Sequence, residues 1–187
     1  MSSHPHLERT ANLLGAFALL VHGQVERALQ DHLGKGRSAA AAVLTIGTRP
    51  RGSIEALSRI LGLTHSAAVR LVEGLVRERM VIKLPGPDRR SSALVLGPQG
   101  ESCCASLLKR RRGVLEQFLK RLPPQACQAV GQALGQMLEH SADSRQEAQH
   151  ICRLCEHSVC KPCPVGSTVR DEIKETNKGG QQDHAVV

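Results

Sequence analysis

The sequence predicts a mainly α fold: a winged helix-turn-helix with a small β-hairpin wing and long N- and C-terminal dimerisation helices. Two short helical segments joined by a glycine-containing turn are followed at once by two short strand-like runs. Long amphipathic segments stand on either side of this unit. The 187 residues include two Phe and no Trp or Tyr, so the core must be built from aliphatic side chains, which favours packing of helix on helix.

The N-terminal segment, residues 7–33, is predicted to form one long helix. Its apolar side chains recur at alternating spacings of four and three, which gives a stripe suited to a partner helix. The stripe consists of Leu7, Ala11, Leu14, Ala18, Val21, Val25 and Ala28. The run "GKGRS" ends this helix, and Ser38 is predicted to cap a second helix that continues through Ile46.

Two short helices are predicted next, with a turn between them. The run "SIEALSRIL", residues 53–61, begins with a capping serine, Ser53, and Gly62 suits the left-handed residue that ends a helix. Thr64 is predicted to cap the following helix, residues 65 to about 79. The predicted buried side chains of that helix are Val69, Val72, Leu75 and Val76. Its predicted outward side chains are His65, Ser66, Arg70 and Glu73.

Two strands and two more helices are predicted downstream. The runs "MVIKL" (80–84) and "SALVLG" (92–97) are typical of strands, and "PGPDRRS" between them is rich in turn residues. Residues 99–121 and 124 to about 149 are predicted helices, separated at the Pro123-Pro124 pair, with Pro124 at a first helical position.

The net charge of +8 is concentrated in the middle of the chain. Residues 51–121 contain fourteen Lys and Arg against six Asp and Glu, whereas the remainder is balanced. A positive field of this kind attracts polyanions such as nucleic acid. The near absence of aromatic side chains argues against base stacking, and hence against a single-strand or RNA platform. The apolar stretch "ANLLGAFALLVHG" is too short to span a bilayer and lacks the basic leader of a signal peptide, so a cytoplasmic location with no membrane partner is expected.

A helix-turn-helix with a basic hairpin behind it is a device for reading double-stranded DNA. The first turn of the second helix would approach base edges in the major groove, where small polar side chains are needed. Arginines at the tip of the hairpin would gain from the negative potential of the minor groove, and Asp88 would hold one of them in position. The candidate DNA-binding residues are Thr64, His65, Ser66 and Arg70 on the helix, and Arg89 and Arg90 on the wing.

The stretch "LSRILGLTHSAAVRLVEGLVRERMVIKLPGPDRRSSALVLGPQG", residues 57–100, closely resembles the DNA-binding core of MarR-type bacterial transcriptional regulators. The matching pieces are the short helix, "GLT" opening the recognition helix, "RLV" along it, and "DRR" in the wing. The long flanking helices agree, so that the resemblance spans about residues 7–149. It implies a homodimer on a pseudo-palindromic operator, more often a repressor than an activator, and a small aromatic or phenolic effector.

On this reading the chain divides into five parts. They are residues 1–36, an N-terminal dimerisation helix; 37–98, the winged helix-turn-helix DNA-binding domain; 99–150, C-terminal dimerisation helices; 151–165, a cysteine cluster; and 166–187, a disordered tail.

The cysteine cluster, "CRLCEHSVCKPC", is not part of the MarR resemblance. It holds four of the seven cysteines at the spacing C-x2-C-x4-C-x2-C, namely Cys152, Cys155, Cys160 and Cys163. Four thiolates suit tetrahedral Zn2+ or a four-iron cluster, although the central spacing of four is tighter than in most zinc ribbons, and His150 or His157 could assist. A thiol–disulfide switch, or no role, is the remaining alternative. If the cluster binds a metal or works as a switch, it is expected to couple a chemical signal to the dimerisation helices beside it.

The sequence therefore predicts a sequence-specific DNA-binding transcriptional regulator, and no enzyme. The alternative is a thiol redox or metal-handling protein that uses the same four cysteines. The βαβ context of such redox motifs is missing from the predicted elements. Cys103, Cys104 and Cys127 are expected to be small apolar residues on helices, with a thiol sensor as the alternative.

Overall fold

The structure, a computed structural model, describes residues 5–34, 36–86 and 92–166. In this part of the chain it contains seven helices and a two-stranded sheet. They are α1 (Pro5–Leu33), α2 (Arg37–Thr48), α3 (Ile54–Leu61), α4 (His65–Arg77), β1 (Val81–Pro85), β2 (Ser92–Leu96), α5 (Pro98–Leu119), α6 (Pro124–Leu138) and α7 (Arg145–Ile151). The predicted mainly α fold with a hairpin wing is confirmed.

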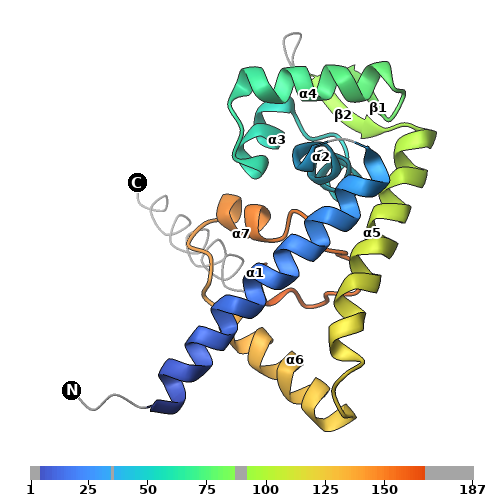
Figure 1. The fold of residues 1–187 in the computed structure, drawn as a ribbon. Helices are drawn as coiled ribbons and strands as arrows, with labels where there is room; N and C mark the ends of the chain where they lie inside the picture. The colour runs from blue at the N-terminus through green and yellow to red at the C-terminus, as the bar shows by residue number, and fades with distance from the viewer. Residues whose placement is uncertain (1–4, 35, 87–91, 167–187) are drawn as a thin grey trace, which may run out of the picture.

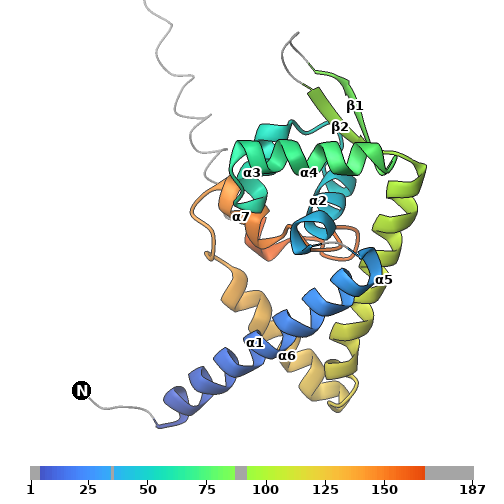
Figure 2. The same cartoon turned by 45° about the horizontal axis from the view of Figure 1, so that its top comes forward.

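The elements form a compact lobe and a helical stem (Figure 1). Helices α2, α3 and α4 and the hairpin make up the lobe, with α4 lying across its outer side (Figures 1 and 2). Helices α1 and α5 pack against each other and lead away from the lobe, and α6 lies at the far end of the stem. Helix α7 turns back and packs on α3. None of the helices in the described ranges is both long and apolar enough to cross a membrane.

Backbone hydrogen bonds join the two strands of the hairpin and also attach it to the rest of the lobe. Its strands are antiparallel, and Val81 pairs with Leu96 at the open end of the hairpin, away from the segment that joins the strands. The connection from α2 to α3 adds a bridge to β2, because Arg51 N donates to Leu94 O (2.7 Å) and Leu94 N donates to Gly52 O (2.9 Å). The base of the wing is thus fixed to the segment that leads into the helix-turn-helix.

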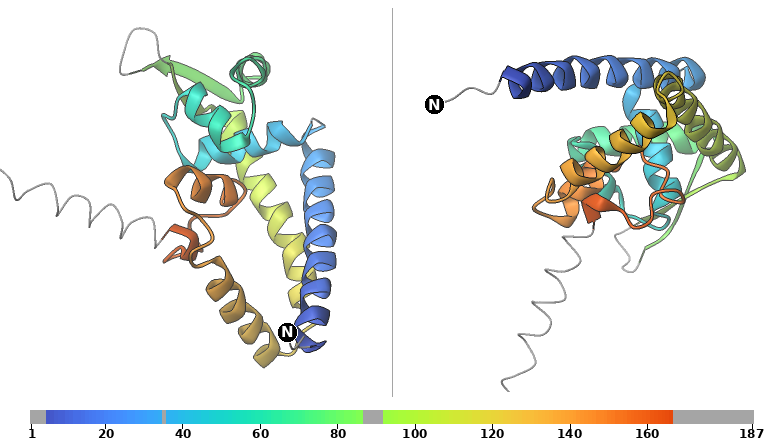
Figure 3. Two further views of the ribbon diagram at one scale, coloured as in Figure 1. Left: turned by 90° about the vertical axis from the view of Figure 1, so that its left-hand side faces the viewer. Right: turned by 90° about the horizontal axis from the view of Figure 1, so that it is seen from below.

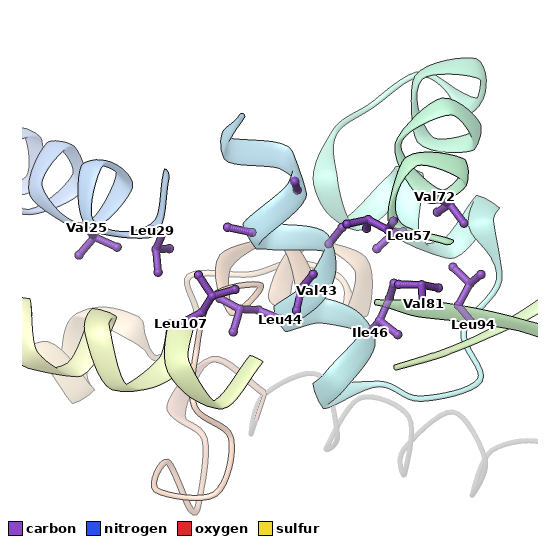
Figure 4. Close-up of a cluster of buried hydrophobic side chains, with 14 residues drawn as sticks. Val25, Leu29, Val43, Leu44, Ile46, Leu57, Val72, Val81, Leu94 and Leu107 are labelled. Carbon is purple, nitrogen blue, oxygen red and sulfur yellow. The ribbon is translucent and has the colours of Figure 1, made fainter. Parts of the chain in front are cut away.

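The core is centred on α2, whose residues 39–46 are all buried. Val43 and Leu44 are completely buried, and Leu107 of α5 reaches them from the stem (Figure 4). Leu57 of α3 and Val72 of α4 close the core from the other side (Figure 4). Because α2 is short and rich in alanine, the surrounding helices can approach it closely, and the buried core is aliphatic, as the composition predicted.

The local capping predictions for the helix-turn-helix are confirmed. Ser53 Oγ accepts a hydrogen bond from Ala56 N (3.1 Å), and Gly62 ends α3 in the left-handed conformation with φ 66°. The prediction for α2 was wrong, since that helix begins at Arg37. Its N-cap is Gly36, without a side-chain hydrogen bond, and Ser38 lies inside the helix.

The helix predicted for residues 124 to about 149 is also wrong beyond Leu138. The chain turns at residues 139–144, where His140 has φ 58°, and Ser144 then caps α7 by accepting from Glu147 N (3.1 Å). Glu147 in return accepts from Asp143 N (3.0 Å). Short polar side chains in "SADS" compete with helical backbone bonds, which explains the break.

A pair of glycines on α5 offers a test of the packing between α5 and the wing. A Cβ at Gly100 would overlap the carbonyl oxygen of Met80, whereas a Cβ at Gly113 would meet nothing within 4 Å. Gly100→Ala is expected to lower the free energy of unfolding by about 1–3 kcal/mol. Gly113→Ala is expected to raise it by up to about 1 kcal/mol. Denaturant unfolding of both variants measures this, and an unchanged Gly100→Ala protein would contradict the packing.

Candidate DNA-binding surface and cysteine pocket

Helix α4 has one buried face and one exposed face. Ala68 and Val72 are fully buried, and Leu75 is 1% exposed. His65, Ser66 and Arg70 are exposed on the other side, together with the capping residue Thr64. Of the predicted buried residues, Val72 and Leu75 are buried, while Val69 and Val76 are partly exposed. The four helix residues predicted to contact DNA therefore share the accessible side of one helix.

The polar side chains in the first turn of α4 lie close to the helix backbone. Thr64 Oγ1 accepts from Ala67 N (3.2 Å) and lies 3.3 Å from Ser66 Oγ. Both hydroxyls thus stay close to the backbone. The N-terminus of a helix also carries partial positive charge and free N–H groups, which suit phosphate and base acceptors.

Two cations that were not predicted extend this surface. These cations are Arg77 and Lys83. They line a shallow hollow where α4 meets β1, together with Arg70, Glu73 and Val76. Arg77 stands two helical turns after Arg70, so the seven-residue spacing was a signal for it. Lys83 had no local signal, because only the packing of β1 against α4 brings it here. The wing residues Arg89 and Arg90, like Asp88, lie outside the described residues, and their predicted role stays a prediction.

The four clustered cysteines come together in one pocket of about 720 Å³. All four are free thiols, and Cys152 Sγ lies 3.9 Å from Cys163 Sγ. The cations Arg49, Arg145 and Lys161 also line the pocket. The pocket walls further include Ala148, Gln149, Cys155, His157, Cys160, Pro162 and Gly166. Thiols and positive charge therefore share one hollow.

The thiols in the pocket have different proton affinities. A hydrogen bond from Cys152 lowers the pKa of Cys155 to about 6, and the charges of Arg111 and Arg49 act in the same direction, against the opposing effect of burial. The same hydrogen bond, together with burial, raises the pKa of Cys152 well above its usual range. Burial raises the pKa of Cys160.

The cysteines on α5 lie in a different setting. Burial raises the pKa of Cys103, and burial and the neighbouring Cys103 raise that of Cys104. Both are half-buried and pack against the main core. They behave as the small apolar residues that the sequence predicted.

The cysteine segment, residues 145–166, lies beneath the helix-turn-helix. His150 donates from Nδ1 to the carbonyl oxygen of Ile60 in the last turn of α3 (2.8 Å). Arg112 of α5 donates to both carboxylate oxygens of Glu156 (2.9 Å each). The sequence predicted the cluster at the end of the dimerisation helices. The turn at residues 139–144 instead carries it back to α3 as well as α5.

The predicted helper histidines have other contacts. His150 is committed to Ile60, and His157 Nε2 lies 3.4 Å from the carbonyl oxygen of Cys152. In the described part of the chain, no three His, Cys, Asp or Glu side chains are grouped closely enough to hold a metal ion.

Comparison with known proteins places this fold. No protein-family model matches the chain, and no curated protein sequence does. The structure is similar to that of Rv1404 from Mycobacterium tuberculosis, with a TM-score of 0.66 and 16% identity over 76% of this chain and 99% of that one. For the transcriptional regulator Tm0710 from Thermotoga maritima the TM-score is 0.55, with 22% identity over 70% and 92%.

Wild-type MarR from E. coli in its apo form is a further structural relative. The TM-score is 0.56, with 20% identity over 67% of this chain and 96% of MarR. A MarR-family regulator from Rhodococcus has a TM-score of 0.53 and 19% identity over 72% and 96%. These matches confirm the resemblance seen in residues 57–100: the chain has the winged helix-turn-helix fold of the MarR-type transcriptional regulators.

Proposed function

We propose that the protein is a sequence-specific DNA-binding transcriptional regulator, and not an enzyme, that binds a pseudo-palindromic operator as a homodimer and acts as a repressor. The observation that carries the proposal is the two-sided character of α4. Its inner face is buried in the lobe, and its outer face presents Thr64, His65, Ser66 and Arg70 from the first two turns. A helix held in this way can enter a major groove without loss of core packing.

The charge around α4 supports duplex DNA as the partner. Arg70, Arg77 and Lys83 border one hollow beside the helix, which is a suitable place for backbone phosphates. The central segment that contains them also holds the whole positive excess of the chain. Phosphate contacts would set the position of the helix, and the small side chains of its first turn would read bases.

The stem supports a second copy of the chain as the other partner. Helix α6 has no buried residue, although Leu134 and Met137 are apolar and are 44% and 51% exposed. The N-terminal half of α1 extends beyond the lobe and is equally uncovered (Figure 3). Its exposed large side chains are Leu7, Leu13, Leu14, Phe17, Leu19 and Leu20. Apolar surface of this extent marks an interaction site, and a symmetric dimer would cover it.

A small-molecule effector is the third expected partner. The structure of the MarR-family protein Rv2887 from Mycobacterium tuberculosis, 19% identical, is described as a complex with p-aminosalicylic acid. In this chain a hollow between α1 and α2 is bordered by His22, Glu26 and Arg37. An effector there would touch the stem and the lobe together, the position from which it could change the distance between two recognition helices.

Selection of bound duplexes from a random library tests the proposal. The full-length protein is expected to enrich a sequence with twofold symmetry, whose half-sites are centred about one helical turn apart. Affinity for this duplex should exceed that for a shuffled one by roughly 1000-fold or more, and should fall steeply with added salt. Failure to enrich any sequence, or equal affinity for both duplexes, would exclude a sequence-specific regulator.

The cysteine pocket favours one alternative function, a thiol redox or metal-handling protein. Cys152 and Cys155 have the C-x2-C spacing and unequal pKa values that such proteins use. The surrounding fold argues against it, since in the described residues the pair lies in a turn after α7 rather than in a βαβ unit. Catalytic reduction of a disulfide substrate by the purified protein would support the alternative.

A further inference from the structure

We propose that Cys152, Cys155, Cys160 and Cys163 form a zinc–thiolate site, and that zinc fixes residues 145–166 against the helix-turn-helix. The first part of the proposal concerns the ion alone. The second part rests on the proposed function, because its readout is DNA binding.

One sulfur from each C-x2-C pair lies at a distance that suits zinc. Cys155 N donates to Cys152 O (3.0 Å), so the first pair is folded into a turn that brings both thiols to one side. Cys163 of the second pair approaches Cys152 to 3.9 Å between sulfurs. A tetrahedral centre with Zn–S bonds of about 2.3 Å has sulfur–sulfur edges of about 3.8 Å. One edge across the two pairs is therefore already at the required length.

The surroundings of the pocket suit the charge of such a centre. Zinc with four thiolates carries two negative charges, which must be compensated when the site is partly buried. Arg49, Arg145 and Lys161 line the pocket, and no Asp or Glu is among its described lining residues. Cys155 and Cys160 line the same hollow, so zinc binding would require the four sulfurs to converge within it.

A cross-link would stabilise the cysteine segment, because the buried cluster beside it is very small. The small buried cluster beside it consists of Ala142, which precedes the segment, and Cys152 and Val165 within it, while Leu154 packs against the main core. A buried cluster of this size contributes little to the stability of the segment, and small units of this kind are normally held by a metal ion or by disulfides. Zinc binding would contribute directly to the free energy that keeps the segment folded.

The position of the segment links zinc to the recognition helix. His150 holds the Ile60 carbonyl, and its ring lies 3.9 Å from where a Cβ on Gly62 would stand, at the turn that precedes Thr64. On the opposite side, the Arg112–Glu156 ion pair fastens the segment to α5. An ordered segment thus supports both the end of α3 and the stem.

Elemental analysis of the full-length protein, purified without chelators and without oxygen, tests the ion. The result expected is about one zinc per chain, in colourless protein, with its loss in the double variant Cys155→Ser/Cys160→Ser. Cys127→Ser, a thiol on α6 outside the segment, is the matched control and should keep its zinc. Iron with acid-labile sulfide, a disulfide in place of metal, or zinc retained by the double variant would each overturn the proposal.

Operator binding by the wild-type protein, before and after removal of zinc with a chelator, tests the link. Affinity is expected to fall by about tenfold or more without zinc and to return when zinc is restored. His150→Ala should keep zinc yet lose affinity by a similar factor. Equal affinity with and without zinc would overturn the link. If neither form recognised any duplex, the proposed function would fail, while the zinc content would still decide the metal site.

Discussion

Arg70→Glu is expected to remove specific operator binding while leaving the fold intact. The arginine projects from the second turn of α4, on the exposed face and beside Arg77 and Lys83. In a dimer the substitution removes two contacts to phosphate or guanine and puts two carboxylates against DNA. With about 1–3 kcal/mol for each lost contact, affinity should fall roughly 100-fold or more. Unfolding stability should change little, because the side chain is exposed.

Arg110→Glu is the control for this experiment. It introduces the same change of charge at an exposed position of α5, on the stem rather than on α4. Screening at physiological salt confines its effect, so affinity should fall by less than about tenfold. Fluorescence anisotropy with the selected operator, at one fixed salt concentration, measures both variants. Equal losses for Arg70→Glu and Arg110→Glu would mean that α4 only contributes to the overall field.

Leu134→Asp combined with Met137→Asp is expected to convert the proposed dimer into folded monomers. These two side chains are the exposed large apolar residues of α6, a helix with no buried residue in the described part of one chain. Placing carboxylates at a buried dimer interface would cost several kcal/mol, since each charge would have to be desolvated. A monomer can occupy only one half-site, so operator affinity should fall by roughly 100-fold or more.

Analytical ultracentrifugation at micromolar concentration measures the change in mass. Gln132→Asp is the control, as it adds a carboxylate to the same helix without removing an apolar side chain. It should leave the protein dimeric. A wild-type protein that sediments as a monomer, or a double variant that remains a dimer, would show that α6 is not part of the interface.

The predictions that proved right depended on local chemistry. Ser53, Gly62 and Thr64 mark helix ends through hydrogen bonds and backbone conformations within a few residues of themselves. The alternation of buried and exposed residues on α4 is equally local. Such features can be predicted from the sequence, because the same short stretch contains both the signal and its partner.

The features that could not be predicted depend on contacts between distant segments. His150 and Ile60 are 90 residues apart, and no pattern near either one indicates their hydrogen bond. Lys83 joins the cations of α4 only through packing of β1. The apolar stripe of α1 shows the same limit. The sequence predicts that the stripe forms one continuous apolar surface. In the structure Val25 is buried in the chain's own core, while Leu7 and Leu14 are exposed.

A photoreactive amino acid placed at Ser66 gives the most direct test of whether the first turn of α4 lies in the major groove of a duplex held by two subunits. Gln117, an exposed residue of α5, serves as the comparison position. After irradiation of the operator complex, the Ser66 probe is expected to cross-link at two sites related by the operator dyad, about 10 base pairs apart. Cross-links from Gln117 with none from Ser66, or a Ser66 probe that labels DNA without twofold symmetry, would contradict this geometry.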